Sequence, residues 1–85
     1  MNDVGIIGGG YIGTVIGAVL AKRGAHITIV ENNQKHLTNL ISGTVEFNEP
    51  NLNTLIKAQI EKNHLAFTTH ISSLEGFPYI LITVG

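Results

Sequence analysis

The sequence predicts one small α/β domain built on a parallel β-sheet, and three observations indicate this fold. Short apolar runs alternate along the chain with segments in which apolar residues recur every three or four positions. The runs are continuously apolar, as in strands that are covered on both faces. The chain has 85 residues, which is enough for a single domain, and no internal repeat or linker divides it.

The first part of the chain predicts a strand, a helix and a second strand. Residues 4–7 are a short apolar run that ends in glycines, and residues 27–30 are a second, β-branched run. Between them a helix is predicted over residues 11–23, where Gly24 can end it. The apolar residues at helical spacing are Ile12, Val15, Ile16, Val19 and Leu20.

The rest of the chain predicts two further helices, a third and a fourth strand, and a helical turn. A short helix over residues 34–41 is followed by Gly43. Pro50 suits the first turn of the next helix, with Asn48 or Glu49 as its cap. The remaining elements are a strand over residues 65–68, a helical turn over 72–75 and a last strand over 79–84. This order of elements implies a parallel sheet with right-handed crossovers.

Composition and charge exclude several classes of protein. The net charge of −1 argues against a nucleic-acid or anionic-membrane partner, and the absence of cysteine excludes disulfides and thiolate metal sites. Residues 4–21 carry no charge, but their many glycines make a poor membrane helix. Asp3 lies where a signal peptide would carry a positive charge. We therefore expect no membrane span and a cytoplasmic location.

The most informative motif is a glycine-rich loop between the first strand and the first helix. Residues 8–13 read GGGYIG, a G-x-G-x-x-G pattern in which each glycine suits a dinucleotide site. Gly8 permits the tight turn, Gly10 lets a pyrophosphate approach the backbone, and Gly13 lets the helix pack on the strand. Gly17, one helical turn after Gly13, also lacks a side chain on the helix face that would pack on the strand. The helix would then direct its free N–H groups at the phosphates.

Glu31 supplies the second part of a dinucleotide site. It closes the second predicted strand, about 20 residues after the glycine motif, where an acid can bind the adenosine ribose hydroxyls. A carboxylate there also repels a 2′-phosphate, which favours NAD over NADP. The alternative is a tight turn and a solvated acid, but strand, loop, helix, strand and acid all occur at the required intervals. The sequence therefore predicts the first half of a Rossmann-type sheet, with strand order 3-2-1-4.

The residues around these motifs resemble two families. Residues 6–13 (IIGGGYIG) and 28–31 (TIVE) are similar to the NADH-binding segment of flavin disulfide reductases. They also resemble the N-terminal segment of the UDP-glucose/GDP-mannose dehydrogenases, in which a leucine-and-glycine helix leads to an E-P-G-L helix start. Here Leu37, Leu40 and Gly43 precede EPNL at residues 49–52.

The later residues favour the nucleotide-sugar dehydrogenases. Residues 65–69 resemble the third strand of that family, and residues 80–85 resemble its fourth. A flavin disulfide reductase would instead need a β-meander before the last strand, and the predicted helix over residues 51–63 leaves little room for one.

The resemblance implies a set of cofactor-binding residues, with some departures from the family pattern. Glu31 replaces the usual Asp, and Asn51 replaces the glycine of E-P-G-L. His36 holds the place of a basic residue that meets the adenosine side, with Lys35 just before it; the alternative for both is a solvated loop. The implied set is Gly8, Gly10, Tyr11, Ile12 and Gly13 at the pyrophosphate, Glu31, Lys35 and His36 at the adenosine, and Val84 bordering the nicotinamide side.

The resemblance also implies a reaction and a limit on what this segment does in it. The parent enzyme would oxidise a sugar C6 alcohol with NAD, and this segment would position the cofactor without making bonds. The family's catalytic thiol lies downstream, and the chain has no cysteine, so we expect no catalytic residue here. We expect residues 1–85 to be a partial dinucleotide-binding domain with no second domain. The alternatives are a free-standing nucleotide-binding module that works with a partner chain, and a fold remnant without a ligand.

The remaining polar residues predict no second site. His26, His36, His64 and His70 lack the spacing of metal ligands, so we expect no metal. No two acids have a spacing that predicts paired-carboxylate catalysis. The right-handed crossovers would place both early helices on one sheet face and leave the fourth strand as an open apolar edge. A homodimer or a partner chain that completes the sheet is therefore expected.

Overall fold

The computed structural model describes residues 3–42 and 50–83, and it contains the predicted elements in the predicted order. Gly43, Asn48, Glu49 and Val84 lie outside the described residues. The helical turn begins one residue earlier than predicted, and the last strand is described as far as Ile82. The elements are β1 (Asp3–Ile7), α1 (Tyr11–Lys22), β2 (His26–Val30), α2 (Gln34–Ser42), α3 (Pro50–Glu61), β3 (Leu65–Thr68), η1 (Ile71–Leu74) and β4 (Tyr79–Ile82).

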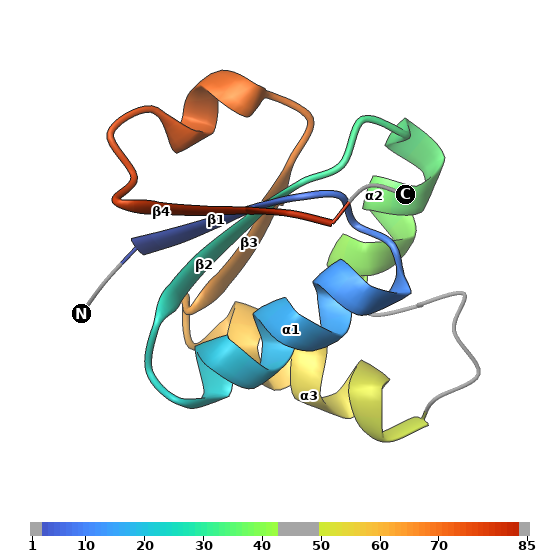
Figure 1. The fold of residues 1–85 in the computed structure, drawn as a ribbon. Helices are drawn as coiled ribbons and strands as arrows, with labels where there is room; N and C mark the ends of the chain where they lie inside the picture. Colours follow the sequence, from blue (N-terminus) through green and yellow to red (C-terminus); the bar gives the residue numbers. More distant parts are fainter. Residues whose placement is uncertain (1–2, 43–49, 84–85) are drawn as a thin grey trace.

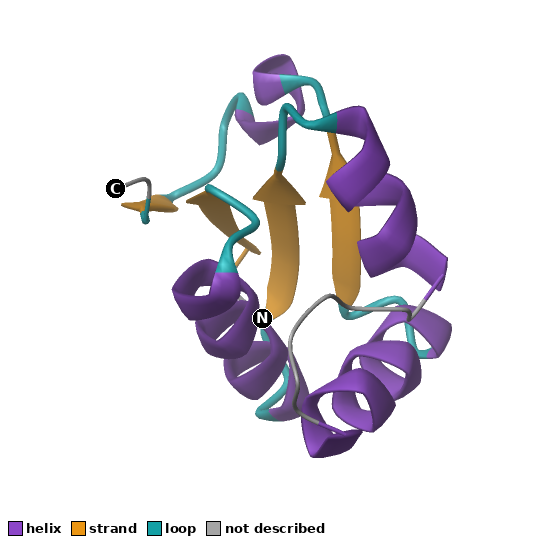
Figure 2. Cartoon of the chain, turned by 90° about the vertical axis from the view of Figure 1, so that its right-hand side faces the viewer, coloured by secondary structure: helices purple, strands orange, loops and turns teal. Residues whose placement is uncertain are grey.

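The four strands form one parallel sheet in the order β3-β2-β1-β4, which confirms the prediction (Figure 2). In register, Ile6 of β1 pairs with Ile29 of β2 and with Leu81 of β4. Because the strands are parallel, their carboxyl ends meet at a single edge of the sheet. The loops that follow β1, β2 and β3 are therefore gathered at that edge.

Helices α1 and α3 lie on one face of the sheet, and η1 lies on the other (Figure 1). On the η1 side, Leu74 is buried over Gly5 of β1, where a Cβ on Gly5 would lie 2.8 Å from the leucine side chain. The η1 face therefore has little covering. This agrees with the expectation that the helices of both early crossovers lie on the opposite face. Among the described residues, no helix has the length and apolar character that crossing a membrane requires.

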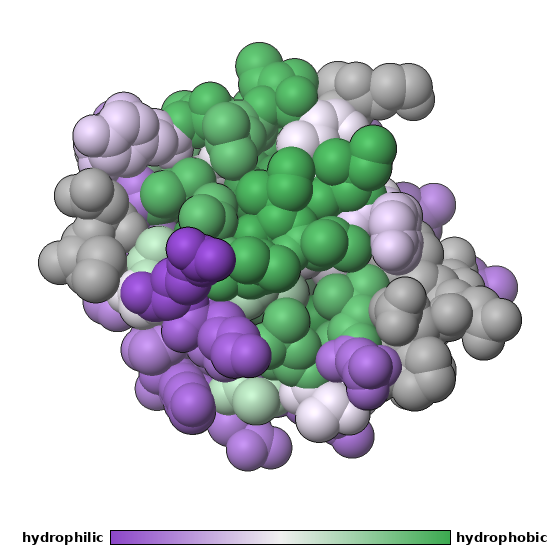
Figure 3. All heavy atoms as spheres, turned by 60° about the horizontal axis from the view of Figure 1, so that its bottom comes forward, coloured by the Kyte–Doolittle hydropathy of each residue, from purple (hydrophilic) through white to green (hydrophobic). Residues whose placement is uncertain are grey.

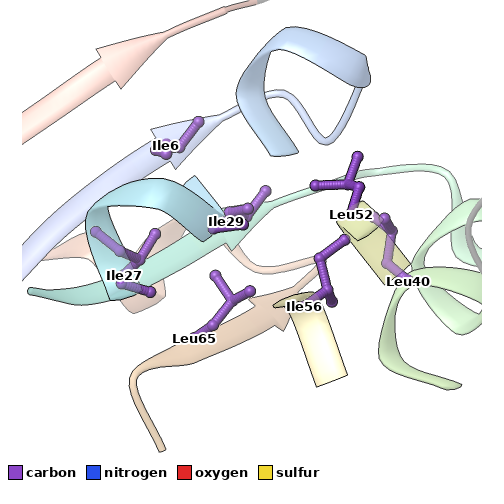
Figure 4. Packing of buried hydrophobic residues seen from close by; sticks show 9 residues of the cluster. Ile6, Ile27, Ile29, Leu40, Leu52, Ile56 and Leu65 are labelled. Carbon is purple, nitrogen blue, oxygen red and sulfur yellow. The ribbon is translucent and has the colours of Figure 1, made fainter. Parts of the chain in front are cut away.

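The core lies between the sheet and its helices. Isoleucines of β1 and β2, together with Leu65 of β3, pack against leucine and isoleucine side chains from α2 and α3 (Figure 4). Each of these side chains is nearly or fully buried, and at about 1.5–3 kcal/mol for each large aliphatic side chain this burial is the main source of stability. The labelled residues are Ile6, Ile27, Ile29, Leu40, Leu52, Ile56 and Leu65.

The buried residues of helix α1 are small, and its larger Val15, Ile16 and Leu20 are partly buried and pack against the core. A Cβ on Gly17 would lie 2.9 Å from Ile29 and 3.2 Å from Ile6, so the helix backbone approaches the sheet closely. Ile12 and Val19, which the helical spacing singles out, are exposed on the outer side. The small residues that face the sheet are Gly13, Thr14, Gly17, Ala18 and Ala21.

Strand β4 is exposed along its whole described length. Seen from the helix side, apolar side chains form a continuous area on the surface (Figure 3). The edge of a parallel sheet also carries backbone groups that can pair with another strand. The exposed large apolar residues of α1 and β4 are Tyr11, Ile12, Val19, Tyr79, Ile80, Leu81 and Ile82.

We predict that the 85-residue chain self-associates through the β4 edge. Sedimentation velocity over a range of concentrations is expected to show a species heavier than the monomer. Ile82→Lys is expected to reduce the association, because Ile82 is 69% exposed and a charged edge residue disfavours strand pairing. A wild-type chain that stays monomeric at every concentration would contradict this prediction.

Candidate dinucleotide-binding site

The glycine-rich loop joins the carboxyl end of β1 to the start of α1. Gly8 has φ = 116°, a left-handed conformation that favours glycine, and its N–H donates to the Val30 carbonyl at 2.9 Å. Gly10 is the N-cap of α1, and no side chain caps the helix there. The first N–H groups of a helix lack a carbonyl partner within it and give this end a positive partial charge. The start of α1 therefore suits an anion.

Gly10 and Gly13 have opposite surroundings. A Cβ on Gly10 meets nothing within 4 Å, so the backbone there borders open space. A Cβ on Gly13 would overlap the Gly8 carbonyl oxygen and would lie 2.5 Å from the Thr83 hydroxyl oxygen. The helix can therefore lie against β1 only if residue 13 has no side chain. The space beside Gly10 remains available to a ligand.

Glu31 lies at the carboxyl end of β2 and turns its side chain toward the glycine loop. Its Oε1 accepts a hydrogen bond from the Gly9 N–H, and its Oε2 accepts one from the Asn33 N–H, both at 2.9 Å. A Cβ on Gly9 would lie 2.8 Å from Oε1, so the carboxylate packs directly on the loop backbone. An ionised carboxylate accepts about four hydrogen bonds, so Glu31 keeps capacity for ligand hydroxyl groups.

His36 joins the same group of residues from α2. Its backbone N–H donates to Asn33 Oδ1 at 2.9 Å, which caps the start of the helix. Its Nε2 is in hydrogen-bond contact with the Gly9 carbonyl oxygen, which also accepts from the Thr14 hydroxyl at 3.1 Å. The hydrogen bonds thus form a closed ring, from Glu31 to Asn33, to His36, to Gly9 and back to Glu31. We call this the Gly9 ring.

Thr83 holds the loop from the opposite side. Its backbone N–H donates to the Ile7 carbonyl at 2.9 Å, which extends the pairing of β4 with β1. Its hydroxyl lies 3.1 Å from the Gly8 carbonyl oxygen and 3.3 Å from that of Ile7. The turn out of β1 is therefore fixed by a residue that is distant in sequence.

A cleft of about 320 Å³ opens beside the loop at the carboxyl ends of β1, β2 and β3. Its volume is at the lower end of the range for small-molecule sites. Apolar side chains form much of its wall, and the Glu31 carboxylate lies on one side. The cleft therefore suits one ring system with polar groups at its rim. The lining residues are Ile7, Gly8, Val30, Glu31, Asn32, Thr69 and Ile71.

The structure brings most of the residues singled out from the sequence to this one place. The loop itself contains Gly8 and Gly10, and Gly13 follows in the first turn of α1. Glu31 and His36 both contact the loop at Gly9. The exposed Tyr11 and Ile12 begin α1, Lys35 is exposed on α2 and does not line the cleft, and Val84 lies outside the described residues.

Sequence reasoning missed Gly9, Thr14, Asn33 and Thr83. The sequence offered a signal for two of them: Gly9 is a glycine at an unconstrained position of the motif, and Thr14 is a polar residue within an uncharged, mostly apolar stretch. In the part of the chain that the structure describes, no three His, Asp or Glu side chains converge as metal ligands would.

Residues 2–85 match the model of the UDP-glucose/GDP-mannose dehydrogenase family, NAD binding domain. The UDP-glucose 6-dehydrogenase of Pseudomonas aeruginosa is 30% identical over 94% of this chain and 18% of its own length. The UDP-N-acetyl-D-mannosamine dehydrogenase of Methanococcus maripaludis is 32% identical over 91% of this chain and 18% of its own length. The chain thus spans about a fifth of the length of these relatives.

Solved structures agree with these matches. A ternary complex of GDP-mannose dehydrogenase from Pseudomonas aeruginosa superposes with a TM-score of 0.89 at 25% identity, over 96% of this chain and 19% of that one. The UDP-glucose dehydrogenase of Pyrobaculum islandicum superposes over all of this chain and 20% of that one, with a TM-score of 0.92 at 22% identity, which supports the fold. The predicted resemblance to nucleotide-sugar dehydrogenases and the predicted fold are confirmed.

Proposed function

This chain belongs to the UDP-glucose/GDP-mannose dehydrogenase family and matches its NAD binding domain, and we propose that its glycine loop, Glu31 and the adjoining cleft position the cofactor. Residues 1–85 would form a partial dinucleotide-binding domain of an enzyme that oxidises the C6 alcohol of a nucleotide sugar. The observation that carries the proposal is the open backbone at Gly10, beside the uncapped start of α1 and across the loop from the Glu31 carboxylate.

The loop residues would hold the pyrophosphate. A phosphate oxygen needs hydrogen-bond donors and positive charge, and the start of α1 supplies both. The open space beside Gly10 lets an anion approach the backbone closely, and no side chain from the N-cap competes for the same amides. Tyr11 and Ile12 contribute through their place in the first turn, where their side chains are exposed.

Glu31 and the cleft would hold the adenosine. The carboxylate is oriented by the Gly9 and Asn33 N–H groups and can accept hydrogen bonds from the ribose hydroxyls. The same negative charge disfavours a 2′-phosphate on that ribose. Val30 and Ile71 offer apolar walls for the adenine ring within the cleft.

The chemistry of the full reaction would need groups beyond these residues. When bound, NAD supplies a hydride acceptor, and this segment would orient it. The 85 residues contain no cysteine, so a step through a thiolate would need a residue supplied from elsewhere. A module that works with a partner chain is compatible with the same site, and the matches to nucleotide-sugar dehydrogenases favour this function over a flavin disulfide reductase.

We predict that the wild-type chain binds NAD more tightly than NADP, as measured by isothermal titration calorimetry. Glu31→Gln is expected to weaken NAD binding roughly tenfold, because hydrogen bonds to a charged carboxylate contribute about 1.5–3 kcal/mol. The same variant is expected to lose much of the preference over NADP. Glu61→Gln is the matched control, because Glu61 is an exposed acid at the far end of α3. Equal wild-type affinity for the two cofactors would contradict the proposed role of Glu31.

A further inference from the structure

The peptide group between Gly9 and Gly10 is held at its carbonyl end by side chains from two helices. Thr14 of α1 donates its hydroxyl hydrogen to the Gly9 carbonyl oxygen, and Nε2 of His36 on α2 contacts the same atom. A carbonyl oxygen can only accept, so His36 Nε2 must carry a hydrogen in this arrangement. His36 therefore acts on the loop as a hydrogen-bond donor, a role that requires no positive charge.

Holding this carbonyl also sets the direction of the neighbouring N–H. No cis peptide bond occurs among the described residues, and in a trans peptide the C=O and N–H bonds point in opposite directions. Because the Gly9 carbonyl is turned inward to Thr14 and His36, the Gly10 N–H is turned away from them. Gly10 borders the open space that the proposed function assigns to the pyrophosphate. A flipped peptide would instead present a carbonyl oxygen to a phosphate and repel it.

The Gly9 ring keeps His36 in place for this task. Asn33 accepts the His36 N–H and donates its own N–H to Glu31, so the start of α2 is tied to the acid that closes β2. Glu31 in turn accepts the Gly9 N–H. The ring thus couples the acid proposed to bind ribose to the peptide proposed to bind phosphate.

We propose that His36 is a positioning residue that orients the Gly9–Gly10 peptide for phosphate binding through the Gly9 carbonyl. This inference rests on the proposed function for its ligand. It differs from the adenosine contact that the family resemblance implies, because Nε2 of the His36 ring contacts the Gly9 carbonyl oxygen of the protein's own loop. The His36 imidazole would therefore influence phosphate binding through the loop backbone, without contacting the phosphate.

The ligand-free chain offers the first test. Nitrogen NMR of the neutral His36 ring is expected to show the tautomer with hydrogen on Nε2. His36→Ala is expected to shift the Gly10 amide signal, whereas His70→Ala, which alters an exposed histidine, is expected to leave it unchanged. Hydrogen on Nδ1 in the neutral ring, or an unmoved Gly10 signal in His36→Ala, would overturn the proposal. These readouts do not depend on whether the chain binds NAD.

Ligand binding offers the second test. His36→Ala is expected to weaken ADP-ribose binding roughly five- to tenfold, the loss of one hydrogen bond, and to leave adenosine binding unchanged. His36→Gln keeps an N–H donor of similar reach and is expected to restore most of the affinity for ADP-ribose. Equal losses for adenosine and ADP-ribose would instead place the ring on the nucleoside and overturn the proposal. A wild-type chain that binds no ADP-ribose would refute the proposed function, while the ligand-free measurements would still decide the orientation of the peptide.

Discussion

Gly13→Ala is expected to destabilise the domain by roughly 3 kcal/mol or more, because the new methyl group has no space. It would overlap the Gly8 carbonyl oxygen, which is backbone, and would lie 2.5 Å from the Thr83 hydroxyl. Domains of this size have a total stability of roughly 4–13 kcal/mol, so the expected loss is a large part of the free energy of unfolding. Urea unfolding followed by circular dichroism measures the effect.

Gly10→Ala is the matched control for this stability measurement. It adds the same methyl group in the same loop, but nothing lies within 4 Å of the new Cβ, and Gly10 has φ = −73°, which alanine adopts readily. The unfolding midpoint of this variant is expected to stay close to that of the wild type. If Gly13→Ala unfolds at the same urea concentration as Gly10→Ala, the result would contradict the close packing of α1 on β1.

Gly10→Ala is also expected to cause the largest loss of function. Its methyl group would occupy the open space beside the start of α1, where we place the pyrophosphate. We expect NAD affinity to fall roughly 100-fold or more, which corresponds to about 2.7 kcal/mol, with no change in stability. Isothermal titration calorimetry on the folded variant measures this. Wild-type affinity in Gly10→Ala would mean that the phosphates bind elsewhere.

The strand order and the element order could be predicted because they depend on local patterns. The apolar runs, the helical spacing and the glycines that end the elements are each patterns of a few residues. The right-handedness of the crossovers then leaves few possible topologies for the sheet. The order β3-β2-β1-β4 and the position of the glycine loop follow from these patterns. Glu31 could be placed at the loop for the same reason, since it ends the strand beside β1.

The orientation of α1 shows where periodicity alone was insufficient. The predicted apolar residues Val15, Ile16 and Leu20 do pack against the core. Ile12 and Val19 are exposed, and the buried residues that face the sheet are small ones such as Gly17. The glycines predicted close contact between helix and strand, but the apolar pattern did not show which face would be buried.

The contacts that hold the loop could not be predicted because they join distant parts of the chain. Thr83 bonds the Gly8 carbonyl across 75 positions, and His36 bonds Gly9 across 27. Such contacts depend on strand register and helix placement to within an ångström or two. A threonine at a strand end or a histidine early in a helix carries no local signal of these partners. Only the assembled sheet brings them together.

The most direct measurement of the central claim is an NMR titration of the 85-residue chain with NAD, read at each backbone amide. We expect saturable shifts at residues 8–13, at Glu31 and at the cleft residues Thr69 and Ile71, because these lie at the carboxyl ends of the strands. No shifts are expected at His26 and His64, which begin and precede strands at the opposite end. No shift at millimolar NAD, or shifts confined to the opposite end of the sheet, would contradict the claim.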